Sequence, residues 1–155
     1  MKSKTMGLRL TTGLLLLAVL HGNASGVTEP KIYWTEVCND KIERANLDGS
    51  GREVLVSGSD LQGLAIDAAA GKIYWTDGSI DAICRSGLDG SEVEVLISKA
   101  RGIDMELDVA DNKLYWLDGY GLDVRRANLD GTGIEMIVEH VPGEDPFLPG
   151  MPHTG

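Results

Sequence analysis

The stretch 72–77, Lys-Ile-Tyr-Trp-Thr-Asp (KIYWTD), occurs three times in the chain in related forms. The other two hexads are KIYWTE at 31–36 and KLYWLD at 113–118, so the spacing is 41 residues both times. A repeat that keeps its period while its letters change is a structural unit, and periods of about 20–50 residues are typical of solenoids and propellers. The hexads contain all three tryptophans and three of the four tyrosines.

Short runs rich in β-branched and aromatic residues alternate with turn signals inside each period. In the second repeat these runs are 72–77, 80–85, 93–97 and 103–108. Four strands of about five or six residues, joined by turns of about four, fill a period of this length. No run of ten or more residues has the apolar spacing of a helix, so the sequence predicts an all-β fold.

The turns recur in register and read NLDGS at 46–50, GLDGS at 87–91 and NLDGT at 128–132. Asp-Gly between two β runs predicts a hairpin turn, because glycine accepts the positive φ at which the chain reverses. Calcium binding by Asp48, Asp89 and Asp130 is the alternative. A calcium loop gathers several oxygens from one segment, and each turn here has one carboxylate. We therefore expect these aspartates to stabilise turns.

Both faces of each hexad carry bulky side chains. In the strand 72–77, Ile73 and Trp75 point to one side, and Tyr74 and Thr76 point to the other. A sheet with one face in water would alternate apolar with charged residues. The pattern therefore predicts small four-stranded antiparallel sheets stacked face to face around an axis, which is a β-propeller with one blade per period.

The order of these segments resembles a known repeat. KIYWTD, an Ile-x-Arg run, NLDG, an apolar run and the GLAID segment at 63–67 are similar to the YWTD repeat, the class B repeat of low-density lipoprotein receptors and of nidogen-like matrix proteins. The resemblance covers about 31–141, as repeats 31–71, 72–112 and 113–141. It implies a six-bladed propeller that serves as a non-enzymatic protein-interaction surface, without catalytic residues or cofactor. This chain would then form a partial propeller of about three blades.

The resemblance assigns structural motif positions, which are Tyr33, Trp34, Tyr74, Trp75, Asp77, Tyr115, Trp116 and Asp118 in the hexads and Arg44, Arg85 and Arg126 in the Ile-x-Arg runs, the third of which has Val in place of Ile. Tyrosine and tryptophan bury large areas and keep one polar end to satisfy, which suits packing between blades. The acid that closes each hexad lies eight residues before the arginine. We expect ion pairs between these two, as in Asp77 with Arg85, Asp118 with Arg126 and Glu36 with Arg44.

Three positions depart from the repeat pattern. Glu36 stands where the motif has Asp, Leu117 stands where it has Thr, and Gly87 stands where the other two turns have Asn. The third repeat is the most divergent, so motif contacts are least secure there.

The first 24 residues predict a secretory signal peptide. A basic front is followed by an apolar run that ends in LLLLAVL, and small residues then allow cleavage after Ala24 or Gly26. An uncleaved anchor is the less favoured alternative, because the apolar run is about ten residues long and a membrane span needs roughly 20. We expect an exported chain, secreted, extracellular or periplasmic, with no membrane span after cleavage.

The sequence at the two ends of the repeat region does not supply the strands that a closed ring needs. Residues 25–30 are too short and too polar for a good strand before the first hexad, which predicts about eleven strands in all. The segment 142–155 contains four prolines and is expected to be a disordered tail. A six-bladed ring at this period needs about 246 residues. Three alternatives follow. A second copy could supply the missing blades in a homodimer, the chain could be a fragment of a longer gene product, or it could be a marginal monomer.

The chain is acidic, with 24 Asp and Glu, and 11 Lys and Arg remain once the predicted signal peptide is removed. This balance excludes ordinary nucleic-acid binding, which needs basic residues on the phosphates. It favours a basic protein partner through long-range attraction. Solubility alone is the simpler alternative.

Side chains outside the motif suggest few other chemistries. Cys38 and Cys84 occupy different repeat positions; export permits a disulfide between them, and two separate thiols are the alternative. Tyr120, between two glycines, is either a ligand contact or packs over the next blade.

A purely structural repeat of a matrix or envelope protein is a further possibility for the function. A lactonase-like propeller hydrolase with an axial metal would need carboxylates such as Asp67 and Asp108, which are more simply strand-end residues.

Overall fold

The computed structural model describes residues 17–19 and 30–140, and the side chains of 30–140. One helical turn, η1 (Val37–Asn39), lies among these residues, and the strands in chain order are β1 (Leu17–Val19), β2 (Lys31–Glu36), β3 (Lys41–Asn46), β4 (Glu53–Ser57), β5 (Leu61–Asp67), β6 (Lys72–Asp77), β7 (Ala82–Gly87), β8 (Glu94–Ser98), β9 (Gly102–Asp108), β10 (Lys113–Asp118), β11 (Val124–Asn128) and β12 (Glu135–Val138).

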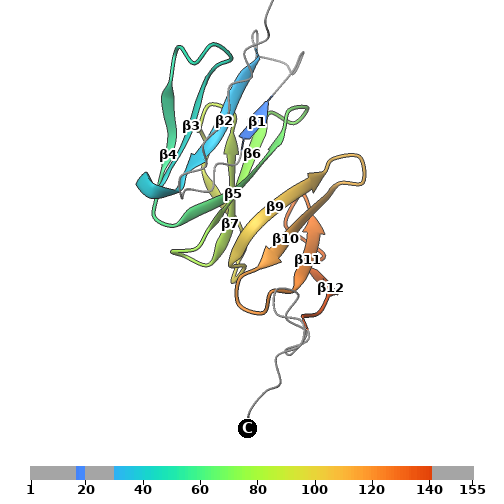
Figure 1. The fold of residues 1–155 in the computed structure, drawn as a ribbon. Helices are drawn as coiled ribbons and strands as arrows, with labels where there is room; N and C mark the ends of the chain where they lie inside the picture. Colours follow the sequence, from blue (N-terminus) through green and yellow to red (C-terminus); the bar gives the residue numbers. More distant parts are fainter. Residues whose placement is uncertain (1–16, 20–29, 141–155) are drawn as a thin grey trace, which may run out of the picture.

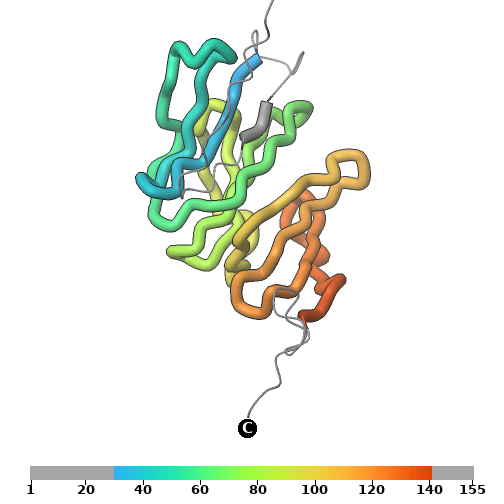
Figure 2. The backbone as a smooth tube through the Cα atoms, in the orientation of Figure 1, coloured from blue at the N-terminus to red at the C-terminus, as the bar shows by residue number. Residues whose placement is uncertain are grey.

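The strands form three antiparallel sheets of four strands, each in simple chain order. We call β1–β4 blade one, β5–β8 blade two and β9–β12 blade three. Figure 1 shows the three sheets following one another across the molecule, and Figure 2 traces the same path along the backbone. The predicted all-β fold with four-stranded blades is confirmed.

The blades are offset from the sequence repeats. Blade two runs from β5 to β8, residues 61–98, whereas the second sequence repeat is 72–112. The offset arises because the hexad is the second strand of its blade, so that the first two repeats each end on the first strand of the next blade, β5 or β9. These two repeats thereby tie consecutive blades together through the covalent chain.

The prediction of about eleven strands is wrong, because β1 supplies a twelfth. It pairs antiparallel with β2, with Leu17 opposite Trp34. It does not come from the polar stretch 25–30 but from further upstream, inside the predicted signal peptide. Cleavage after Ala24 stays a prediction, and it would remove β1. The predicted tail, 142–155, lies outside the described residues.

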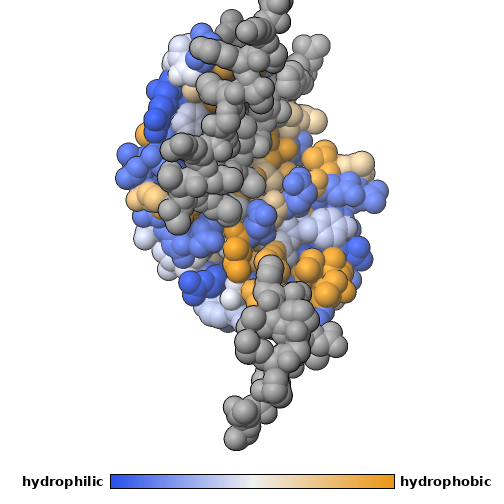
Figure 3. Space-filling model, viewed as in Figure 1, coloured by the Kyte–Doolittle hydropathy of each residue, from blue (hydrophilic) through white to orange (hydrophobic). Residues whose placement is uncertain are grey.

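Two separate hydrophobic cores lie between the blades. We call the face of a blade that packs against the following blade its trailing face. The opposite face, which packs against the preceding blade, is its leading face. The alternation of the hexad puts Tyr74 into the core between blades two and three and Trp75 into the core between blades one and two. Both side chains are almost fully buried. Figure 3 shows further hydrophobic residues gathered on the visible surface over β11 and β12.

Each trailing face also receives two consecutive residues from the outermost strand. In blade two, Ile83 pairs with Ile97 and Cys84 pairs with Val95, so Leu96 is an extra residue in the ladder. Because this bulge breaks the two-residue alternation, Leu96 and Ile97 both reach the same core. The same shift occurs between β3 and β4, where it brings Leu55 and Val56 to the first core.

Candidate functional site

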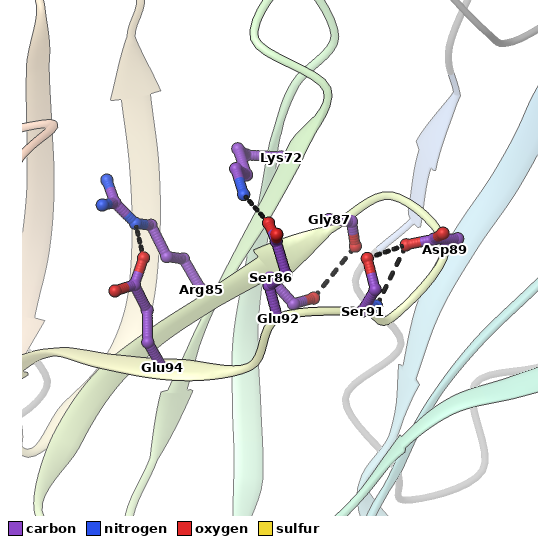
Figure 4. Close-up of polar contacts among 8 residues, drawn as sticks. All are labelled: Lys72, Arg85, Ser86, Gly87, Asp89, Ser91, Glu92 and Glu94. Atoms are coloured by element: carbon purple, nitrogen blue, oxygen red, sulfur yellow. Dashed lines mark hydrogen bonds and ion pairs between the residues drawn. The ribbon is translucent and has the colours of Figure 1, made fainter.

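The arginine of each Ile-x-Arg run lies at a seam between blades. Arg85 Nε is 2.6 Å from Glu94 Oε1 in the neighbouring strand, and Nη1 donates to the backbone carbonyl of Leu129 in blade three at 3.0 Å. Arg44 repeats both contacts, with Glu53 at 2.7 Å and the Leu88 carbonyl at 2.8 Å. Figure 4 shows the pair of Arg85 and Glu94 beside the turn that carries Asp89. The ion pair therefore closes within one blade, while the same guanidinium binds the next.

The predicted ion pairs between hexad acids and these arginines are wrong. Antiparallel pairing sets Arg85 opposite Tyr74 and Glu94, whereas Asp77 lies opposite Ala82 at the strand end. Asp77 instead accepts hydrogen bonds from the backbone and side chain of Ser79.

The other two hexad acids form ion pairs with arginines other than the predicted ones. Asp118 pairs with Arg125 Nε at 3.2 Å, and Glu36 pairs with Arg52 at 3.1 Å. Arg126 binds Glu135 at 2.6 Å, in the same way that Arg44 and Arg85 bind their glutamates. In every blade the true partner of the Ile-x-Arg arginine therefore lies nine residues after it.

The Asp-Gly turns have the role predicted for them. Asp89 Oδ1 accepts hydrogen bonds from the side chain and the backbone N–H of Ser91 at 2.5 and 3.0 Å. These bonds, the side-chain one first, hold the pKa of the Asp89 carboxyl below its ordinary value. Asp48 and Asp130 accept from Ser50 and Thr132 in the same geometry. Each turn therefore uses one carboxylate oxygen, Oδ1, internally, and Gly90 follows Asp89 at a φ of 79°.

The carboxylates considered for an axial metal lie at strand ends, where each accepts a hydrogen bond from the turn that follows. Asp67 accepts a hydrogen bond from Ala70 N at 2.9 Å, and Asp108 accepts one from Asp111 N at 3.1 Å. Within 17–19 and 30–140, no three His, Cys, Asp or Glu lie close enough together to hold a metal ion. His140, at the end of this range, donates its backbone N–H to Asp123.

The two cysteines lie in different surroundings. Cys38 is exposed in η1, whereas Cys84 is buried in β7, and no disulfide joins them in the structure. Cys84 belongs to the core between blades one and two. Its burial, and to a smaller extent the charge of nearby Asp77, raise the pKa of the thiol to about 11.

Tyr120 is the most exposed large apolar side chain of the described region, at 67%. It lies in the loop between β10 and β11, and its hydroxyl donates to Asp81 Oδ2 in the β6–β7 loop at 2.7 Å. The Arg101 guanidinium lies over the tyrosine ring at 5.5 Å from its centroid, and its Nη2 is 3.9 Å from Asp60 Oδ2. Tyr120 thus reaches back to blade two, not forward to a following blade.

We call Asp60, Asp81, Arg101 and Tyr120 the Tyr120 cluster. Its members come from four loops at one end of the blades, and backbone hydrogen bonds hold these loops together, from Ala100 to Asp81 and from Gly119 to Arg101. The hydrogen bond to Asp81 is the first cause of a raised pKa at Tyr120. The exposed Ile80 and Leu122 lie in the same loops. The Tyr120 cluster, Ile80 and Leu122 together form a surface that presents an aromatic ring, a cation and apolar side chains.

Sequence reasoning singled out Tyr120 but missed its neighbours and the seam glutamates. Glu53, Glu94 and Glu135 recur at the 41-residue period, nine residues after each arginine, and this regularity was visible in the sequence. Arg101 and Asp81 have no such signal, because their meeting with Tyr120 depends on loops from different blades.

The fold and the repeated seam define a class, the YWTD-type β-propeller. The family model for the low-density lipoprotein receptor repeat class B matches the chain twice, at 30–68 and 71–108. The chain therefore belongs to the family of proteins built from this repeat. The third repeat, the most divergent in sequence, lies outside both matches, and its three strands complete a four-stranded sheet with β9. No curated protein matches the chain.

Solved propellers have the same fold. A chain of the crystal structure of the nidogen/laminin complex matches with a TM-score of 0.68 at 22% identity, over 85% of this chain and 51% of that one. A gluconolactonase from Xanthomonas campestris matches with a TM-score of 0.60 at 17% identity, over 80% and 52%. A structural-genomics protein from Bacteroides thetaiotaomicron has a TM-score of 0.55 at 21% identity, over 71% and 34%. This chain thus spans about half the length of the first two.

Proposed function

We propose that this chain is an exported, non-enzymatic module that binds a protein ligand through the Tyr120 cluster. The observation that carries the proposal is the exposure of Tyr120 together with its fixation by Asp81 and Arg101. A large ring that is held in place by its neighbours loses little conformational freedom on binding, and Tyr and Arg are enriched among residues that dominate interface energies.

Several findings support the parts of this proposal that concern protein binding and export. The chain belongs to a repeat family, and one structural neighbour is a complex between two proteins, nidogen and laminin. Within the described ranges, no helix is long and apolar enough to cross a membrane. We propose secretion or export to the periplasm, guided by the predicted signal peptide, and completion of the ring by a second copy or by further sequence.

The charge of the same surface supports a basic ligand. Asp40, Asp60, Asp81 and Asp123 lie in the loops at this end of the blades, all partly exposed to solvent. Two of these carboxylates already face cations, Asp60 facing Arg101 and Asp123 facing Arg125. A basic protein would approach faster at low salt, because exposed charges are screened beyond about 10 Å at 0.1 M ionic strength.

The test compares the purified exported protein with two variants as baits for the surrounding extracellular fraction. Tyr120→Ala removes the ring. Val93→Ala is the control because Val93 is also exposed, at 56%, but lies beside the Asp-Gly turn at the opposite end of blade two. A ligand retained by wild type and Val93→Ala should bind Tyr120→Ala at least about tenfold more weakly, the loss of about 1.4 kcal/mol expected for an interface residue of this kind. Unchanged binding of that ligand to Tyr120→Ala would remove the proposed site.

A further inference from the structure

No other blade of the described chain covers the trailing face of blade three. Tyr33 and Tyr74, on the trailing faces of blades one and two, are buried, but their counterpart Tyr115 is only half-buried. It lines an open hollow with Trp116 and Val124. Ile137 is 42% exposed, although its counterparts Leu55 and Leu96 are packed against the cores.

Among the described residues, no blade covers the leading face of blade one. Leu47 is 49% exposed, whereas Leu88 and Leu129, at the same position of the Leu-Asp-Gly turn, are 6% and 7% exposed. A Cβ added at Gly90 would lie 2.6 Å from the Leu55 carbonyl oxygen, and one added at Gly131 would lie 2.7 Å from that of Leu96. A Cβ added at Gly49, the counterpart in blade one, would have nothing within 4 Å among the described residues.

The two uncovered faces are the two halves of one seam. In the seams that the chain forms internally, an arginine donates to the leucine carbonyl of a Leu-Asp-Gly turn, and the turn glycine lies against a leucine of the outermost strand. Arg126 keeps the ion pair with its glutamate, but no backbone carbonyl of the described chain takes the place of Leu88 or Leu129. The leading face of blade one carries the same Leu-Asp-Gly sequence at 47–49.

We propose that a second copy of this chain places its leading face on the trailing face of blade three. Arg126 then donates to the Leu47 carbonyl of the second copy, and that copy's Gly49 lies over Ile137. Because each copy has one face of each kind, two copies related by a twofold axis form two identical seams and close a ring. The chain covers 51% of the nidogen-complex propeller chain, so two copies supply the blades of about one such ring.

This inference commits to one of the two ways in which the ring is completed, and it can fail without affecting the Tyr120 cluster. The two involve different residues, because the cluster lies on loops at one end of the blades and the seam lies on the blade faces. Tyr120→Ala should therefore leave association between copies unchanged.

Sedimentation of the purified protein over a wide concentration range tests the proposal. Wild type should form a dimer, and Ile137→Asp should weaken it at least about tenfold, because a charge would be buried in the seam without a partner. Met136→Asp is the matched control on the same strand. Its counterparts Val54 and Val95 stay about half exposed within the chain, so this position faces away from the seam.

A mixing experiment tests the head-to-tail arrangement. Leu47→Asp damages the leading face, and Ile137→Asp damages the trailing face, so each variant alone should dimerise at least about tenfold more weakly than wild type. A mixture should restore a dimer with one seam, because each variant keeps the face that the other lacks. Circular dichroism should show that both monomers stay folded, since both side chains are exposed in the single chain. A wild-type monomer at every concentration, a dimer that Ile137→Asp leaves intact, open polymers, or no restoration on mixing would each overturn the proposal.

Discussion

Arg85 donates a hydrogen bond to the backbone carbonyl of Leu129, 44 residues further along the chain, at 3.0 Å. The same guanidinium binds Glu94 in its own blade. One side chain thus fixes the outer strands of blade two and the turn of blade three relative to each other. The contact between Arg44 and Leu88 does the same one blade earlier, so the seam is a repeated device.

Replacing Arg85 by Met should lower the free energy of unfolding by about 1–3 kcal/mol, because the carbonyl of Leu129 loses a charged donor at a part-buried seam. Glu94→Gln, which removes only the half-exposed ion pair, should cost less than about 1 kcal/mol. Urea unfolding monitored by tryptophan fluorescence measures both. Equal losses in the two variants would show that the bond between blades contributes nothing.

Gly90→Ala should destabilise the chain more than Gly71→Ala. Both glycines have positive φ, 79° and 67°, so each substitution carries a backbone strain of about 1–2 kcal/mol. Only at Gly90 does the new methyl group meet the backbone of Leu55, which adds about 1–3 kcal/mol of overpacking. Thermal unfolding of the two variants under one set of conditions provides the comparison, and a Gly71→Ala variant as unstable as Gly90→Ala would contradict the seam geometry.

Stability should fall in acid through the aspartates of the turns. The hydrogen bonds from Ser91 lower the folded-state pKa of Asp89, so ionisation of this carboxyl favours the folded chain. This contribution is fully present above the unfolded-state pKa, about 3.9, and is lost as the pH falls through the folded-state pKa. In Ser91→Ala the pKa of Asp89, followed by carbon NMR, should move back up toward its ordinary value. No movement would mean that another group sets the pKa.

The two thiols should differ in reactivity. Cys38 is exposed, whereas Cys84 is buried with a thiol pKa of about 11 and is almost fully protonated at neutral pH. A thiol-reactive chromophore should therefore label Cys38 quickly in the native protein, and Cys84 only after unfolding. Cys38→Ser should abolish the fast phase. If neither thiol reacts until a reductant is added to the unfolded chain, the two cysteines form the disulfide that the structure lacks.

The exported protein should begin at Ser25 or Val27. Cleavage at either site would remove β1, so blade one would keep the three strands β2–β4. Intact-mass measurement of the protein from the extracellular or periplasmic fraction gives the start directly. A mass that includes residues 17–19 would instead show that β1 stays in the sheet and that the N-terminal stretch is not a cleaved leader.

The strands of the second repeat were predictable because each is a short apolar run between turn signals. The predicted runs 72–77 and 103–108 match β6 and β9 to within a residue. The predicted start of β7 at Ile80 was two residues early, because Ile80 and Asp81 lie in the loop beside Tyr120. Strand β1 was missed because its residues have the composition of a leader, and composition does not show that a segment pairs with β2.

The repeat, its period, the turns and the family could all be derived from the amino-acid sequence, because they depend on local residue preferences that recur every 41 positions. Which charged side chains meet depends on how the strands pair and the blades pack. Asp77 and Arg85 are close in sequence, but antiparallel pairing places Glu94 beside Arg85 and leaves Asp77 at the strand end. The bond from Arg85 to Leu129 and the cluster around Tyr120 arise because consecutive blades bring distant loops together, and no local pattern encodes that approach.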